Sequence, residues 1–188
     1  GLRSGLASLA KANRGLAKSD RLTMTERALF TDMLCAILDR DAGARDHETR
    51  LLNQRTAART GLSDPHFAIV AGTNEHRQLM GVARLLLDSR ITYAAQVHAD
   101  DMAALGFFEH ESPVPGRRHF SDRQAEAGYH GGGGENLHQG SAPGASSVLG
   151  WISSPGHHSN MLQPAHGLIG PGISAGYGVE VFGSRSRR

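Results

Sequence analysis

Residues 168–182 read LIGPGISAGYGVEVF, and this stretch decides the fold class of the chain. Two apolar runs flank a turn of small residues at 174–176. In the second run, aromatic and β-branched residues alternate with Gly178 and Glu180, which is the two-residue period of a strand. The pattern therefore predicts an antiparallel hairpin close to the end of the chain.

Helical patterns precede this hairpin. After Asp88 and Ser89, one stripe of a helix is predicted at Ile91, Ala94, Ala95, His98, Met102 and Leu105. Other helices are predicted over 23–37, 46–60, 73–88 and 148–152, with a break at 61–72, and Ser121 with Gln124 predicts a capping box for a short helix that Gly128 ends. Helices first, a loop-rich middle and a terminal hairpin predict an α+β domain.

Composition narrows the classes of function. A net charge of +2 and an aromatic content of 5% argue against a nucleic-acid partner. No apolar run approaches the ~20 residues of a transmembrane segment. The single cysteine, Cys35, cannot form an internal disulfide and stands among apolar residues, so a small buried side chain is the favoured interpretation.

Several motif-like stretches lack residues that their chemistry requires. His110-Glu111 begins a zinc-protease pattern, but Val114 stands where the second histidine is needed. The glycine run 131–134 is not followed by Lys-Ser or Lys-Thr, so a phosphate loop is not expected. No aspartate follows Asp122 to orient a catalytic histidine, which leaves a serine hydrolase poorly supported.

Three side chains of metal-ligand type remain, each where the backbone is expected to bend. His110 follows an aromatic pair, Glu135 follows the glycine run, and His157 follows a Pro-Gly break. Two imidazoles and a carboxylate suit a divalent transition metal and leave a coordination position for water. The alternative is that these are ordinary surface groups, because the chain has 11 histidines and sequence alone does not bring the three together. His98, on an apolar stripe, is expected to be a hydrogen-bonded core histidine.

A series of short motifs runs from about residue 73 to 183 in a characteristic order. They are HADDMAALGFFEHESP (98–113), Arg123, GY (128–129), GENL (134–137), Trp151, SPGHHSNML (154–162), GPG (170–172) and VEVFG (179–183). Together they resemble the bacterial branch of the CAP superfamily, which groups cysteine-rich secretory proteins, antigen 5 and plant pathogenesis-related proteins. The resemblance implies an α-β-α sandwich, with a small antiparallel sheet between helices, in an extracellular, periplasmic or surface-exposed protein.

The resemblance also implies a central cleft lined by two histidines and two acids. The matching motifs place the histidines at His110 and His157 and one acid at Glu135, so His158 is expected to face solvent. The second acid has no counterpart, because no aspartate or glutamate lies between Glu135 and Glu180. Metal binding weaker than that of a complete set is therefore expected.

Other residues of the resembling motifs are expected to be structural. Glu111 replaces the missing acid only if its loop folds back. Trp151 is expected to pack between helix and sheet, and Asn136 to bind loop backbone. Arg123 is expected to pair near Glu126.

The favoured interpretation is a secreted or envelope-facing binding module, with a cleft of His110, Glu135 and His157 that takes zinc or another divalent metal. Its ligand is left open between a lipid and a peptide. One alternative is a metal-assisted hydrolase of peptide or cell-wall substrates, with Glu135 as the base. Another is a structural protein that assembles through its N-terminal helices. The predicted domains are a helical extension (1–72), a CAP domain (73–183) and a basic tail (184–188).

Overall fold

The computed structural model describes residues 40–184 of the 188-residue chain. The helix predicted over 23–37, with Cys35, and the last four residues of the predicted tail lie outside the described residues. The chain divides into two compact units, residues 1–47 and 48–188, and the fold and site described below belong to the second.

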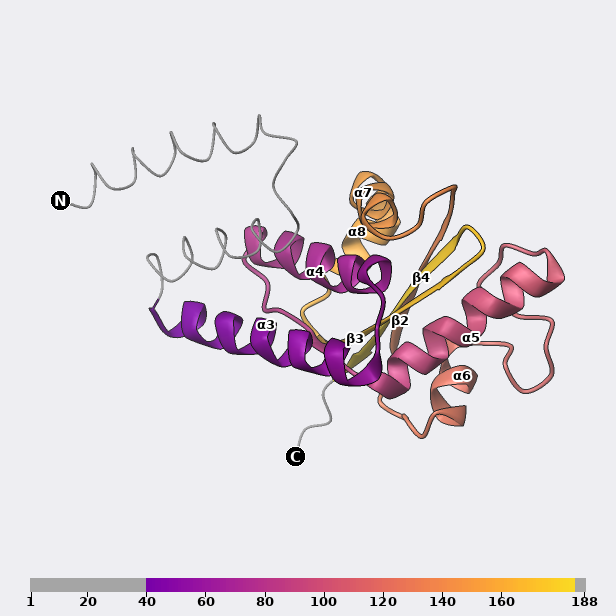
Figure 1. The fold of residues 1–188 in the computed structure, drawn as a ribbon, viewed down its shortest axis with the longest axis horizontal. Coiled ribbons are helices and arrows are strands. Elements are labelled where there is room, and N and C mark those ends of the chain that lie inside the picture. Colours follow the sequence, from indigo (N-terminus) through magenta and orange to yellow (C-terminus); the bar gives the residue numbers. More distant parts are fainter. Residues whose placement is uncertain (1–39, 185–188) are drawn as a thin grey trace. The chain divides into compact units, whose positions relative to one another are not determined.

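Helices and one small sheet build this unit (Figure 1). In chain order the elements are α3 (Arg40–Thr60), α4 (Asp64–Leu79), β1 (Leu86–Leu87), α5 (Ser89–Leu105), α6 (Phe120–Glu126), β2 (Gly133–Gln139), α7 (Ala145–Ser153), α8 (Pro155–Met161), β3 (His166–Ser174) and β4 (Tyr177–Ser184). The predicted hairpin is confirmed as β3 and β4. The sheet has the order β1-β3-β4-β2, with β2 antiparallel to β4 and β1 parallel to β3, so β2 forms an edge.

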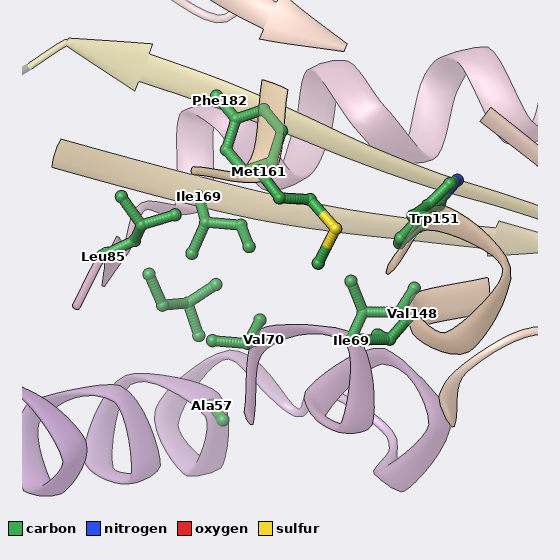
Figure 2. Close-up of a cluster of buried hydrophobic side chains, with 10 residues drawn as sticks. Ala57, Ile69, Val70, Leu85, Val148, Trp151, Met161, Ile169 and Phe182 are labelled. Carbon is green, nitrogen blue, oxygen red and sulfur yellow. The ribbon is translucent and has the colours of Figure 1, made fainter. Parts of the chain in front are cut away.

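Helices cover both faces of the sheet. Val181 of β4 packs with residues of α5 in one buried cluster. The next residue, Phe182, points to the opposite face and joins residues of α4, α7 and α8 in a second cluster (Figure 2). Because successive strand residues point to opposite faces, the two clusters form two separate cores. The predicted α-β-α sandwich and α+β class are confirmed.

Two glycines let α5 lie directly on β3. A β-carbon at Gly170 would collide with the backbone of Ile91 and Thr92, and one at Gly172 would collide with the backbone of Ala95 and Gln96. Both collisions are with main-chain atoms, which cannot rotate away. The GPG motif therefore sets the distance between the helix and the sheet.

The segment before α5 differs from the prediction. The expected break at 61–72 is wrong beyond residue 63, because α4 begins at Asp64 and holds Pro65 in its first turn, where proline is tolerated. The expected single helix over 73–88 is also wrong at its end. It stops at Leu79, and Gly81 then adopts a φ of 75°.

Two asparagines hold the extended chain that follows α4. Asn53 and Asn74 both donate their amide groups to the carbonyl of Leu85, and Asn74 accepts from the Leu85 N–H (2.6 Å). The predicted domain boundary at residues 72 and 73 falls inside α4. Ala57 of α3 and Val70 of α4 both lie in the buried cluster, so the core includes residues from before that boundary.

The start of α6 also differs from the prediction. The helix begins at Phe120, and the carboxylate of Asp122 accepts from the backbone N–H of His119 (2.9 Å). The cap is therefore formed by a pair that starts before the predicted pair of Ser121 and Gln124. Gly128, with a φ of 76°, follows the end of the helix as predicted.

Candidate functional site

The candidate site lies at the free edge of β2, where chain from both faces of the sheet meets. Glu135 is in β2 and shares a face with Val181, its partner on β4. The loop between α5 and α6 brings His110 to this carboxylate. From the opposite face, α8 carries His157. The three predicted site residues thus come from a loop, a strand and a helix.

Two asparagines fix α8 against the edge strand. Asn136 Nδ2 donates to the backbone carbonyl of His157 (3.2 Å), and Asn160 Nδ2 donates to the carbonyl of Glu135 (3.2 Å). The Trp151 indole donates to the carbonyl of Leu137 (2.8 Å) and is buried between helix and sheet, as predicted. Asn160 and Trp151 thus satisfy carbonyls that an edge strand would otherwise leave open.

The Glu135 carboxylate has both oxygens engaged. His110 Nδ1 donates to Oε1 (2.9 Å), and Arg123 Nη2 donates to Oε2 (2.6 Å). The side chain of Glu135 is 2% exposed and that of Arg123 is fully buried. A buried carboxylate is stable only beside a compensating charge, and Arg123 supplies it.

Arg123 also holds the loop that carries His110. Its Nη1 donates to the carbonyls of Arg117 (2.8 Å) and Arg118 (3.2 Å). The prediction that Arg123 pairs near Glu126 is wrong, because Arg117 takes that carboxylate (2.7 Å). Local sequence favoured Glu126, three residues away on the same helix, whereas the true partner comes from β2. Sequence reasoning therefore missed the cation of the site.

His98 lies next to Glu135 and is a core histidine, as predicted. It is fully buried, and its Nε2 donates to the carbonyl of Glu109 (2.9 Å), next to His110 in the loop. Burial lowers the pKa of His98, partly opposed by Glu135, whose Oε1 lies 3.8 Å from His98 Nε2. A neutral imidazole that donates to Glu109 can fix the loop without adding charge.

The surroundings of His110 and His157 shift the pKa values of the two side chains in opposite directions. The hydrogen bond to Glu135 raises the pKa of His110, whose side chain is 59% exposed. Burial, and secondarily the charge of His110, lower the pKa of His157. Because Nδ1 of His110 is bound to Glu135, its Nε2 is the nitrogen left for a ligand.

His158 is partly exposed and also contacts a residue of α4, which the sequence did not predict. Its Nε2 lies 2.8 Å from His76 Nε2 of α4, and the two ring centroids are 4.9 Å apart. The adjacent histidines of α8 therefore point to different partners, since consecutive helical side chains diverge. The sequence carried no signal for this contact, because His76 precedes His158 by 82 residues.

Glu111 does not replace the missing acid. Its carboxylate accepts from Arg118 (2.6 Å) and its side chain is 53% exposed. Glu180, the acid of β4, is fully buried and accepts from Thr73 (2.7 Å) and Asn136 (2.8 Å). It lies on the face of the sheet opposite to Glu135, in register with Asn136.

These contacts limit how a metal ion would be held. Within residues 44–184, no three histidine, cysteine or acidic side chains are grouped closely enough to form a metal site. Glu135 has no free oxygen, and the buried guanidinium of Arg123 would repel a cation beside it. Of the three predicted ligands, His110 has a free Nε2 and is oriented by its hydrogen bond to Glu135, an arrangement common around metal-bound histidines.

The described residues thus form a three-layer α-β-α domain in which an exposed imidazole binds a buried carboxylate at a sheet edge. The model of the cysteine-rich secretory protein family, CAP, matches residues 70–182. The chain belongs to this family.

Two bacterial proteins are similar to this chain. The uncharacterized protein YkwD of Bacillus subtilis (strain 168) is 30% identical over 120 residues, which are 64% of this chain and 46% of YkwD. An extracellular protein containing an SCP domain from Bacillus anthracis str. Ames superposes with a TM-score of 0.59 at 25% identity, over 64% of this chain and 40% of that one. The chain thus spans less than half the length of either relative.

A third comparison concerns the fold alone. An outer surface protein from Borrelia burgdorferi superposes with a TM-score of 0.55 at 15% identity, over 66% of this chain and 95% of that protein. In the part of the chain described by the structure, no helix has the length and apolar character needed to cross a membrane.

Proposed function

We propose that this domain is an extracellular or envelope-facing binding module, and that His110 and His157 bind a divalent transition metal such as zinc. The observation that supports the proposal is the hydrogen bond from His110 Nδ1 to a buried Glu135, which leaves Nε2 available as a ligand. The extracellular protein of Bacillus anthracis and the outer surface protein of Borrelia burgdorferi share this fold and support the location.

In this proposal Glu135 acts on the metal through His110 and is not itself a ligand. A carboxylate that accepts from a metal-bound histidine fixes the ring orientation and makes the other nitrogen more basic. Arg123 binds the other oxygen of that carboxylate and holds it in place. With two protein ligands, the remaining coordination positions are left for water or for a donor group of a bound ligand, either lipid or peptide.

Calorimetric titration of zinc into the metal-free full-length chain tests the proposal. We expect one equivalent of zinc to be lost in the His110→Ala/His157→Ala double variant. His130→Ala is the matched control, because His130 is an exposed histidine outside the cleft. Equal zinc binding by the double variant and the wild-type protein would refute the cleft as a metal site.

A hydrolase is the second candidate, and the His110–Glu135 pair is the observation that favours it. In many hydrolytic sites a histidine acts as the general base and a carboxylate orients it. We assign the base to His110 in place of Glu135, because the Glu135 side chain is 2% exposed and has both oxygens bound. A panel of peptide and cell-wall substrates, assayed with and without zinc, should show turnover that His110→Ala removes; absence of turnover throughout would exclude this candidate.

A further inference from the structure

A second pair of histidines lies outside the cleft. His76 is near the end of α4 and His158 is in α8, and their Nε2 atoms are 2.8 Å apart. Both side chains are partly exposed. The rings are tilted by 52°. Two imidazole nitrogens from different helices thus converge at a site that solvent can reach.

The short distance has a simple chemical meaning. Two lone pairs would repel at 2.8 Å, so one Nε2 carries a proton and donates it to the other. When the donor ring carries its proton on Nδ1 instead, both Nε2 atoms present lone pairs at one place, which is the neutral form that binds a metal ion.

The spacing is close to that of a metal site. With metal–nitrogen bonds of about 2.05 Å, two ligands of one ion have nitrogens about 2.9 Å apart at a right angle and about 3.3 Å apart at a tetrahedral angle. The observed 2.8 Å needs only a slight opening of the pair. Metal binding also requires each ring to turn its Nε2 lone pair from the other nitrogen toward the ion.

We propose that His76 and His158 form a second metal site, which binds a divalent transition ion such as zinc or nickel between α4 and α8, with water completing the coordination. The site is separate from the cleft, because His157 and His158 leave α8 in different directions. It does not depend on whether the cleft binds metal. A bound ion would join α4 to the helix that carries His157.

Zinc titration of the untagged full-length chain, followed by imidazole ¹H–¹⁵N spectra, tests this site. The Nε2 signals of His76 and His158 should shift together. In His76→Gln, zinc affinity at His158 should fall by about tenfold or more, because one of two protein ligands is lost. His66→Gln is the matched control: it removes a histidine from the same helix, one bound to Ser63 (2.7 Å) and Gln96 (2.9 Å), and should leave both shifts unchanged.

The spectra separate this site from the cleft. If His76 and His158 shift while His110 and His157 do not, the second site stands and the cleft proposal fails. If zinc leaves the signals of His76 and His158 in place, or if folded His76→Gln retains wild-type affinity at His158, the second site is overturned. The backbone amide spectrum of each variant shows that it has folded.

Discussion

Glu135 and Arg123 show how a single buried charge pair can support an exposed histidine. The guanidinium binds both the carboxylate and the loop carbonyls of Arg117 and Arg118. His110 then takes the remaining carboxylate oxygen. The pair thus links α6 to β2 and also holds the carboxylate that binds His110.

Removing the arginine alone should be costly. Arg123→Met keeps much of the side-chain volume but leaves Glu135 buried without its counter-charge, so we expect a loss of about 3–5 kcal/mol in the free energy of unfolding. Urea unfolding measures it. The double variant Arg123→Met/Glu135→Gln should recover part of the loss. A single variant within about 1 kcal/mol of wild type would contradict the assigned role of the pair.

Single residues were predictable from the sequence where their role is local or where a motif carries them. The core position of His98 followed from its apolar stripe, and His110, Glu135 and His157 followed from the resemblance. The partner of Arg123 could not be predicted, because it depends on how α6 meets β2. These contacts are set by packing between elements that sequence spacing does not describe.

At the scale of elements, the contact of α5 with β3 depends on a close approach of two backbones. Gly170 and Gly172 face the helix backbone, whereas Ile169 enters the opposite core. The alternation of a strand thus places the two glycines on one face. The predicted helix after Asp88 and the predicted hairpin were confirmed. Both were predictable because their apolar residues recur with the spacing typical of a helix and of a strand.

A methyl group should not fit at this contact. Gly172→Ala places its β-carbon against the backbone of Ala95 and Gln96, so we expect a destabilisation of about 1–3 kcal/mol from overpacking. Gly156→Ala is the control, because a β-carbon in α8 at that position meets nothing within 4 Å. The control should be neutral or slightly stabilising, as alanine favours helix. Thermal unfolding of both variants tests this expectation. Equal melting temperatures would argue against a requirement for glycine at residue 172.

The elements hardest to predict were those whose residues favour one local structure while tertiary contacts favour another. The segment 61–72 contains proline and glycine, yet its second half is helical because Pro65 occupies the first turn of α4, where no N–H is required. The apolar run at 84–88 extends a helical pattern, yet it forms β1 because Asn53 and Asn74 hold Leu85 and Leu87 in an extended conformation. Both outcomes depend on tertiary contacts.

For the whole molecule, helices cover both faces of the sheet, and the titratable groups that are buried in this way include Glu180 and His166. Burial raises the pKa of Glu180 to about 7. Burial, and secondarily the charge of Arg77, lower the pKa of His166 to about 4, where its ring stacks on Phe182 at a centroid distance of 4.7 Å. Both groups favour the neutral form. As pH rises, the contribution of Glu180 to stability decreases, whereas that of His166 increases.

For Glu180, the folded pKa of about 7 lies above the ordinary value of 4.5. The folded state therefore holds the proton more tightly, and this contribution is complete below pH 4.5 and is lost as pH rises through about 7. The interval between the two values corresponds to about 3 kcal/mol. For His166 the contribution is complete above pH 6.5 and is lost as pH falls toward about 4.

Glu180→Gln should remove the first contribution. The amide keeps hydrogen bonds to Thr73 and Asn136, so we expect wild-type stability near pH 4 and a gain of about 3 kcal/mol at pH 8. Urea unfolding at several pH values between 4 and 8 measures the difference. Glu126→Gln is the control, because this exposed carboxylate binds Arg117 and should give no such gain. A pH-independent difference between Glu180→Gln and wild type would exclude a buried, protonated Glu180.

The architecture as a whole was available from the sequence because many motifs in one order identify a family even when no single motif suffices. That identification supplied the sandwich and the site at once. It did not show that residues before 73 contribute to the core, since Ala57 and Val70 lie outside the recognised motifs.

The divergence of His157 and His158 on α8 also bears on which changes the chain can accept over evolution. Each added residue turns a helix by about 100°, so an insertion or deletion between Ser154 and His157 would point both imidazoles away from His110 and His76 together. Substitutions at Pro155 or Gly156 would leave the rotation of the helix intact. Length variation in this short segment is therefore expected to be rarer than variation in its composition.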